Sequence, residues 1–510
     1  MKKIILPGVA ILLVIGLAAG VVWWLTRPQA ITFSDDSKLI LLGADYGRRH
    51  TVPGGKLPKG PPRAGAPANR TGNSTFQTPT DMLVVWVRAK YDYTPNQPAS
   101  TTGRATVYQP NQNPNFQFYV YDQSGTACAS ASTRNVTGQR GDDVLAFQFN
   151  TFPRREGKVV LRAQESYGGG QEMADSKFLV PNPAAKKTFA KWTAEPMPDR
   201  QTDGDLAVTL TKLLAGADMP YQRNQDNPDD AMNKGVQLAF HLERNGKPVS
   251  NWAPAALEFT DATGNRSAIN YGQNGGNQVK WNGDEGVLTY QNSLWPDEPA
   301  WKLRMEMSQT SDFSSDESWT AQNIPVVPGS QQSFNGLAGV RGGAVVVRGA
   351  PPGRGAAPVA ATPPAPPTPC AEADLGDHHI KVFPVVQFTN QTVAMSGGAV
   401  YTQPLQAGLM VQIQPAVSVA SRLVNVAQTT DDGMRLTLAK VTDDQGGELR
   451  SYNSGTSTAG TMGSADSSST FRFTFQNTDG VTNITATIAI HKNRFYEFTV
   501  KPEKAAANQN

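Results

Sequence analysis

The chain has 510 residues, a formal net charge of +3 and two cysteines, and 17% of its residues are charged. A charge so close to neutral argues against a dedicated nucleic-acid binder, and two cysteines cannot build a disulfide framework. The length allows about three domains, and the abundant glycine and proline predict many turns and few long helices.

The first predicted element is a membrane anchor in residues 1–26, where an uninterrupted apolar run extends from Ile4 to Leu25. As a helix, this run would cover about 33 Å, enough for a hydrocarbon core of roughly 30 Å. A cleaved signal peptide, the alternative, would have a shorter apolar core followed by a small-residue cleavage site. Here the small residues at 18–20 are followed by more apolar residues. We therefore expect an uncleaved, single-pass anchor.

The charges around the anchor predict its orientation. Lys2 and Lys3 precede the run, and Arg27 and Lys38 follow it. The positive-inside rule then favours a cytoplasmic N-terminus with the bulk of the chain outside. Because the MKK start is typical of bacterial proteins, we expect the inner (cytoplasmic) membrane, with the bulk of the chain in the periplasm or outside the cell.

Residues 27–80 are expected to form a basic, Gly/Pro-rich juxtamembrane stalk, in which Leu39 to Leu42 could be a strand docking on the first module. The stretch from Arg48 to Arg70 contains no acidic residue. A solvated spacer is the plainer interpretation, and contact with an anionic lipid or cell-wall polymer is the functional one. The residues that would make this contact are Arg48, Arg49, Lys56, Lys59 and Arg63.

Beyond residue 80, apolar and polar residues alternate with period two, as in half-buried antiparallel strands. One such strand places Val236, Leu238 and Phe240 on a single face. No convincing helical stripe follows the anchor. We therefore expect an all-β region made of antiparallel strands.

A weak internal repeat divides this region into modules. In each copy a D-x-x-G turn follows an apolar strand, because Asp can bond the turn backbone and Gly supplies a positive φ. The turns are at Asp122/Gly125, Asp261/Gly264 and Asp443/Gly446. The predicted fold is three Ig-like or fibronectin-like β-sandwich modules. They span residues 81–183, 186–328 and 377–503, with a Pro/Ala/Gly-rich linker at 329–376 and a disordered tail at 504–510.

The sequence contains no G-x-S-x-G, H-E-x-x-H or phosphate-loop motif. The segment from Cys370 to His379 has metal-ligand residue types, but adjacent histidines in a strand point to opposite faces, and no second pair stands at a zinc spacing. His241 and His491 are expected at the surface, and His50 in the stalk. We expect no metal, no cofactor and no enzymatic activity.

Two further residue types leave alternatives open. Cys128 and Cys370 could form one disulfide in an oxidising compartment, or remain two free thiols. The second module contains six of the nine tryptophans. An exposed indole can stack on a sugar ring, whereas a buried one fills a core. We expect Trp295 in the core and keep Trp301 as a possible ligand-stacking residue.

The function expected from these features is a structural or interaction protein of the bacterial envelope, such as a scaffold, adhesion or assembly component. The alternative is a carbohydrate- or cell-wall-binding protein that acts through the Trp-rich second module. The expected partners are the membrane, through Ile4 to Leu25, and an envelope protein or a glycan.

Overall fold

The structure is a computed structural model, and it describes residues 29–53, 75–92, 114–121, 127–130, 132–139, 141–167, 170–218, 234–270, 279–290, 294–329, 368–388, 395–396, 399–400, 406–417, 433–459, 467–476 and 478–505. These residues form an all-β fold of several sheets, in which nearly all strand pairs are antiparallel. No helix in these ranges is long and apolar enough to cross a membrane. The expected anchor, Ile4 to Leu25, lies outside them.

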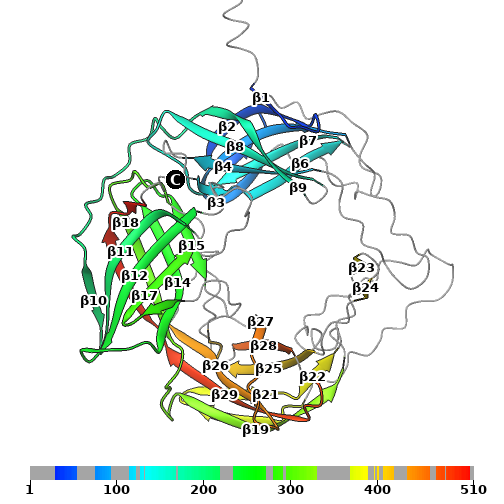
Figure 1. The fold of residues 1–510 in the computed structure, drawn as a ribbon, viewed down its shortest axis with the longest axis vertical. Coiled ribbons are helices and arrows are strands. Elements are labelled where there is room, and N and C mark those ends of the chain that lie inside the picture. Colours follow the sequence, from blue (N-terminus) through cyan, green and yellow to red (C-terminus); the bar gives the residue numbers. More distant parts are fainter. Residues whose placement is uncertain are drawn as a thin grey trace, which may run out of the picture.

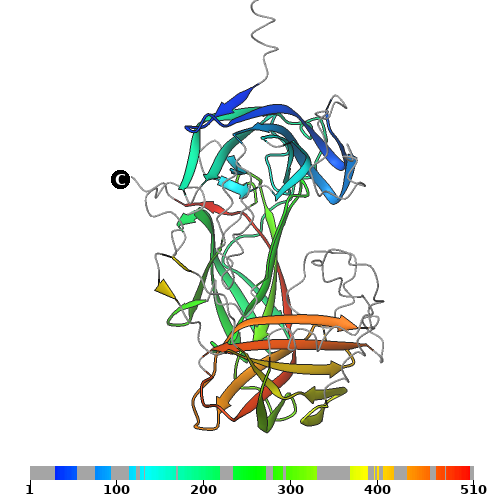
Figure 2. The same ribbon diagram turned by 90° about the vertical axis from the view of Figure 1, so that its right-hand side faces the viewer.

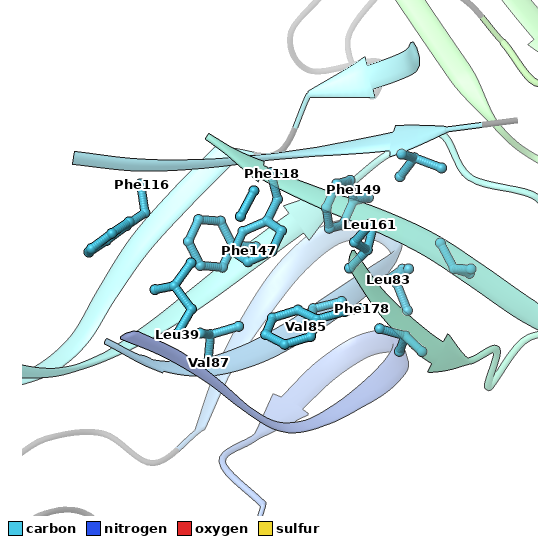
Figure 3. Close-up of a cluster of buried hydrophobic side chains, with 14 of the residues drawn as sticks. Leu39, Leu83, Val85, Val87, Phe116, Phe118, Phe147, Phe149, Leu161 and Phe178 are labelled. Atoms are coloured by element: carbon cyan, nitrogen blue, oxygen red, sulfur yellow. The ribbon is translucent and has the colours of Figure 1, made fainter. Parts of the chain in front are cut away.

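The first unit packs two sheets face to face (Figure 1). One sheet contains, in spatial order, β1 (Ala30–Thr32), β2 (Lys38–Thr51), β3 (Thr75–Lys90), β7 (Asp142–Phe149) and β6 (Ser132–Gln139). The other contains β5 (Ala127–Ser130), β4 (Asn115–Tyr121), β8 (Lys158–Tyr167) and β9 (Gly170–Pro181). The core between them is aromatic: the Phe118 ring centroid lies 4.4 Å from that of Phe147 and 5.7 Å from that of Phe178 (Figure 3).

The first unit begins earlier than the repeat predicted. Strands β1 and β2 lie within the range 27–80 that was expected to be a stalk, and β2 pairs with β3 from Lys38↔Lys90 to Thr51↔Thr75. Leu39 is fully buried in the first core, so the strand expected at this point does dock on the first module. The basic and glycine-rich composition of the segment concealed these strands.

The middle unit also packs two sheets. The first contains, in spatial order, β10 (Asp199–Asp203), β11 (Leu206–Asp218), β12 (Lys234–Arg244), β17 (Glu285–Tyr290) and β16 (Lys280–Asn282), with β13 (Lys247–Pro248) beside β12 and β31 (Glu503–Lys504) beside β11. The second contains β15 (Arg266–Asn270), β14 (Trp252–Asp261), β18 (Trp301–Gln309) and β30 (Arg494–Val500). The predicted alternation in β12 is confirmed, because Val236, Leu238 and Phe240 are all fully buried.

The third unit is inserted into the middle unit between β18 and β30. Its strands are β19 (Ser318–Pro328), β20 (Ala371–Leu375), β21 (His378–Val382), β22 (Val385–Phe388), β25 (Gln406–Gln414), β26 (Met434–Asp443), β27 (Ser451–Ala459), β28 (Ser468–Gln476) and β29 (Asn483–Lys492), with the small pair β23 (Met395–Ser396) and β24 (Ala399–Val400). The first and last of these strands, β19 and β29, pair with each other from Ser318↔Ala489 to Pro325↔Asn483. The insert therefore starts and ends at neighbouring points, as tolerated domain insertions do.

This insertion changes the strand content of the two later modules. The ranges 186–328 and 377–503 assumed that each module ends with its own last strand. Instead, β19 belongs to the third unit, and β30 pairs with β18 of the middle unit from Trp301↔Val500 to Met307↔Arg494. A sequence pattern indicates a strand but not the strand with which it pairs, so the sequence could not assign β19 or β30 to a unit.

The three units follow one another along the long axis of the molecule. In both views the first unit, with β1, lies at one end, the middle unit lies between, and the third unit, with β19, lies at the other end (Figures 1 and 2). The chain therefore enters the described structure at the end opposite the third unit.

Candidate functional site

A buried polar contact, here called the Arg154 joint, connects the first unit to the middle unit. Arg154 precedes β8 and is 3% exposed. Its Nε donates to Asn265 Oδ1 at 2.8 Å and its Nη1 donates to the Thr263 carbonyl at 3.0 Å, both in the middle unit. Within the first unit, the guanidinium donates to Tyr46 Oη at 2.7 Å, to the Asp81 carbonyl at 3.2 Å and to the Asn150 carbonyl at 3.3 Å. Burial lowers the pKa of Arg154, and the surrounding oxygens oppose this effect.

The middle unit's side of this joint is a predicted D-x-x-G turn. Gly264 N donates to the Asp261 carbonyl at 3.0 Å, and Gly264 has a φ of +89°, as the motif requires. Asp261 Oδ1 accepts from Thr263 N at 2.8 Å and from Asn265 N at 3.1 Å. A Cβ atom at Gly264 would lie 3.2 Å from Arg154 Nη1. The glycine therefore serves both the turn and the close approach of the first unit.

An ion pair lies beside the Arg154 joint. Arg155 Nε is 3.0 Å from Glu298 Oε1, and Glu298 is 3% exposed. Burial raises the pKa of Glu298 and the Asp261 carboxylate adds to this, whereas Arg155 lowers it. Trp295, three residues earlier, belongs to the hydrophobic core of the first unit. The two units thus share polar and apolar contacts.

A second buried contact, the Glu306 joint, connects the middle unit to the third. Glu306 lies on β18, Arg435 on β26, and Asn493 between β29 and β30. Glu306 Oε1 accepts from Arg435 Nε at 2.8 Å and from Asn493 Nδ2 at 2.6 Å. All three side chains are buried. The joint lies where the chain returns from the insert.

His491 lies near the Glu306 joint and not at the surface. The expectation of an exposed residue is wrong, because His491 is 1% exposed and its ring lies 5.1 Å from that of Phe313. Its Nε2 is 2.9 Å from Thr437 Oγ1, and its Nδ1 has no hydrogen-bond partner among the described residues. Burial lowers the pKa of His491 to about 4, Glu317 opposes this, and Arg435 lowers it further.

His50, expected in the stalk, lies on β2 and is fully buried, with its ring 5.2 Å from that of Phe76 on β3. Its Nδ1 is 2.5 Å from Asp45 Oδ1 and its Nε2 is 3.1 Å from Thr78 Oγ1. The order Asp–His–hydroxyl is that of a hydrolase triad. However, Thr78 Oγ1 donates to the Thr80 carbonyl at 2.8 Å and Thr78 is 7% exposed. The hydroxyl is engaged and largely shielded from solvent, so we interpret the cluster as structural.

The segment from Cys370 to His379 forms the hairpin β20–β21. His379 contacts Asp374 Oδ1 at 2.7 Å through Nδ1 and Glu372 Oε2 at 3.1 Å through Nε2, whereas His378 Nδ1 lies 3.3 Å from the Pro415 carbonyl. The hydrogen bond with Asp374 raises the pKa of His379. The two histidines thus have separate partners, and in the described part of the chain no group of three or more His, Cys, Asp or Glu side chains is arranged to hold a metal ion.

The possible disulfide remains a prediction. Cys370 is a free, exposed cysteine whose Sγ lies 3.4 Å from the Val382 carbonyl. The side chain of Cys128, on β5, lies outside the described residues.

Trp301 cannot stack on a ligand from solvent, because it is fully buried in the middle core and its Nε1 donates to the Trp295 carbonyl at 3.1 Å. Trp295 is buried, as expected. Of the other tryptophans of the predicted second module, Trp252 is buried and three are half-buried: Trp192, Trp281 and Trp319. Trp281 packs against the middle core and Trp319 against the third, while Lys302 Nζ lies 4.8 Å from the Trp192 ring centroid.

The basic residues of the expected stalk are divided between described and undescribed parts of the chain. Arg48 and Arg49 are exposed on β2, and Arg48 Nε lies 3.6 Å from Asp81 Oδ1. Lys56, Lys59 and Arg63 lie outside the described residues. A contact with an anionic polymer therefore remains a prediction.

Sequence reasoning missed the residues of both joints. One signal was available, because the repeat reads FPRR at residues 152–155 and WPDE at 295–298, with opposite charges at corresponding positions. For Glu306, Arg435 and Asn493 we find no such signal, since they come from three separate strands or turns. No protein-family model matches the sequence, and no curated protein is significantly similar to it.

Proposed function

We propose that this protein is a membrane-anchored, extracytoplasmic scaffold of the bacterial envelope that holds Ig-like or fibronectin-like β modules at fixed positions and has no enzymatic role. The observation that carries the proposal is the Arg154 joint. There, a single buried guanidinium makes hydrogen bonds to both the first and the middle unit.

The energetics of the joint favour a mechanical role. Contacts between domains are by default polar, small and mobile. A buried charge that loses its partners is strongly unfavourable. Removing one partner of a buried ion pair costs roughly 3–5 kcal/mol of stability. Arg154 is satisfied only while Asn265 and Thr263 stay in place. The joint therefore favours one angle between the two units.

The insertion of the third unit supports the same proposal. Two chain crossings, at residues 310–317 and at Asn493, join the third unit to the middle unit, and the Glu306 joint lies beside them. Two crossings restrict rotation more than the single linker of a serial arrangement. The third unit, at the far end of the long axis, is the part best placed to meet a partner (Figure 2).

The membrane part of the proposal comes from the sequence. The apolar run Ile4 to Leu25 follows two lysines and ends four residues before the first described residue, Gln29. The alternative of glycan binding has less support, because none of the six tryptophans of the predicted second module is fully exposed.

The proposal is tested by crosslinking the tagged, full-length protein in its native membrane and identifying the crosslinked material by mass spectrometry. We expect a stoichiometric protein partner crosslinked mainly to the third unit. Retention of glycan or cell-wall material without a protein partner would contradict the scaffold proposal. Turnover of a small molecule by the purified chain would contradict its non-enzymatic character.

A further inference from the structure

The outer surface of strands β8 and β9 in the first unit combines apolar and cationic side chains. Three cross-strand pairs form this β8–β9 outer face: Lys158↔Pro181, Val160↔Leu179 and Arg162↔Lys177. Their neighbours Val159, Leu161, Phe178 and Val180 point into the core and are fully buried. The three pairs thus hold three cations, three apolar residues and no carboxylate.

Leu179 is unusual for its exposure. In the described ranges only three large apolar side chains are more than about a third exposed: Leu42 (37%), Leu179 (42%) and Val327 (37%). Single exposed leucines are common on protein surfaces and need no explanation by themselves. Leu179 differs from such residues because it lies next to Gln29, the first described residue.

Gln29, the first described residue, is fixed beside Leu179. Its side chain donates from Nε2 to the Leu179 carbonyl at 3.0 Å and accepts at Oε1 from Leu179 N at 2.9 Å. Its own carbonyl accepts from Leu41 N at 2.9 Å, and Leu41 precedes the exposed Leu42. Gln29 is therefore held between β2 and β9, and both strands carry an exposed leucine at this point.

The chain length places this point close to the predicted bilayer. Leu25 ends the apolar run, so four residue steps separate it from Gln29. An extended chain covers at most about 3.6 Å per residue, or about 14 Å over this distance. The headgroup layer extends roughly 5–8 Å beyond the hydrocarbon core. The edge of β9 must then lie at or near the headgroups.

We propose that the β8–β9 outer face of the first unit, together with Leu42, docks on the anionic surface of the bilayer in which the chain is anchored. Apolar residues surrounded by Lys and Arg suit such a surface, because the former enter the headgroup layer and the latter attract anionic lipid. This inference rests on the proposed membrane anchor. It orients the molecule with the first unit on the membrane and the third unit furthest from it.

The test uses the full chain with Cys128→Ser and Cys370→Ser, reconstituted into mixed phosphatidylcholine–phosphatidylglycerol vesicles. One variant carries a fluorophore on Leu179→Cys and the matched control carries it on Val327→Cys, which is exposed to a similar degree in the third unit. A lipid with a nitroxide on its headgroup quenches nearby fluorophores. We expect several-fold stronger quenching at position 179 than at position 327.

Charge variants distinguish docking of the β8–β9 outer face from mere closeness of the first unit to the bilayer. Lys158→Glu with Lys177→Glu is expected to reduce the quenching at position 179 several-fold. The same charge change at Lys247 and Lys280, exposed lysines of the middle unit, is expected to leave it unchanged.

The failures of the two proposals are distinguishable. Release of the protein from the vesicles by alkaline carbonate would overturn the anchor and with it the docking. Retention in the vesicles with equal quenching at positions 179 and 327 would overturn the docking alone. If position 179 is shielded from solvent in cells but not in lipid vesicles, the β8–β9 outer face would be assigned to a protein partner. This result would also overturn the docking on the bilayer.

Discussion

Arg154 Nε lies 2.8 Å from Asn265 Oδ1, and this hydrogen bond crosses from the first unit to the middle unit. Asn265 in turn donates from Nδ2 to the Phe152 carbonyl at 3.0 Å and accepts at Oδ1 from Phe152 N at 3.2 Å. The amide of one unit thus pairs with the backbone of the other as a strand residue would. These hydrogen bonds fix the orientation of the middle unit relative to the first.

Truncation of Arg154 should weaken the joint strongly. Arg154→Ala leaves Asn265 Oδ1 and the Thr263 carbonyl with fewer partners in a buried site, and we expect a loss of about 3 kcal/mol in the free energy of unfolding. Denaturant unfolding followed by hydrogen exchange at residues 261–265 measures it. The control is Arg200→Ala, which removes an exposed pair with Glu243 and should cost less than about 1 kcal/mol. Equal effects of the two variants would show that the joint is not a major contact.

His491 should make the stability of the third unit depend on pH. Its pKa is about 4 in the fold and about 6.5 when unfolded, so the unfolded chain binds more protons between these values. Stability should therefore rise by about 3 kcal/mol as the pH increases from 4 to 6.5, and this contribution should be constant above 6.5. Thermal unfolding at several pH values measures it. His491→Gln should flatten the profile in this window, and an unchanged profile would exclude His491 as the source.

Glu165, which accepts a hydrogen bond from Ser37 of the β1–β2 turn, should make stability fall as the pH rises. This is the reverse of the effect of His491. Burial, aided by Asp35 and Glu172, raises the pKa of Glu165 to about 7, while the hydrogen bond from Ser37 Oγ at 2.7 Å lowers it. A raised carboxyl pKa gives a contribution that is complete below about 4.5 and is lost as the pH rises through 7.

Hydrogen exchange at residues 33–37 checks this expectation. Exchange should accelerate between about pH 4.5 and 7 beyond its intrinsic increase, and Glu165→Gln should remove the extra acceleration. Wild-type exchange that follows only the intrinsic pH dependence would contradict the assignment.

Strand β30 should stabilise the middle unit, although most strands of that unit lie far earlier in the chain, between Asp199 and Gln309. Phe498 on β30 is 1% exposed in the middle core and pairs with Leu303. Phe498→Ala should destabilise the middle unit by about 3–5 kcal/mol through loss of buried surface and a cavity. Hydrogen exchange at the Leu303 amide measures this loss of stability. Phe495→Ala, at a half-buried position of the same strand, is the control and should cost markedly less.

The sequence predicted local structure better than strand partners. The D-x-x-G turns at Asp261 and Asp443 are confirmed, since Gly264 and Gly446 donate to the corresponding Asp carbonyls and have positive φ. The sequence could not predict that β19 belongs to the third unit and β30 to the middle unit. Alternation of apolar and polar residues indicates a buried face but not which sheet covers it. The turn of the first repeat, Asp122 to Gly125, lies outside the described residues.

Buried polar residues were the least predictable part of the candidate site. His491 stands at the end of an apolar run, where a surface residue is expected, but it lies within β29 and Phe313 packs against its ring. Arg154 and Glu306 have ordinary surface residue types, and their burial depends on another unit. Such contacts are tertiary, so no local pattern reveals them.

If the three units are held in one arrangement, the distance between the first and the third unit should have one narrow distribution. Spin labels on Leu179→Cys in the first unit and Val327→Cys in the third, in the Cys128→Ser and Cys370→Ser background, report that distance by pulsed electron resonance in the full chain. We expect a single narrow distribution that broadens in Arg154→Ala and not in Arg200→Ala. A broad or multiple distribution in the parent protein would contradict it.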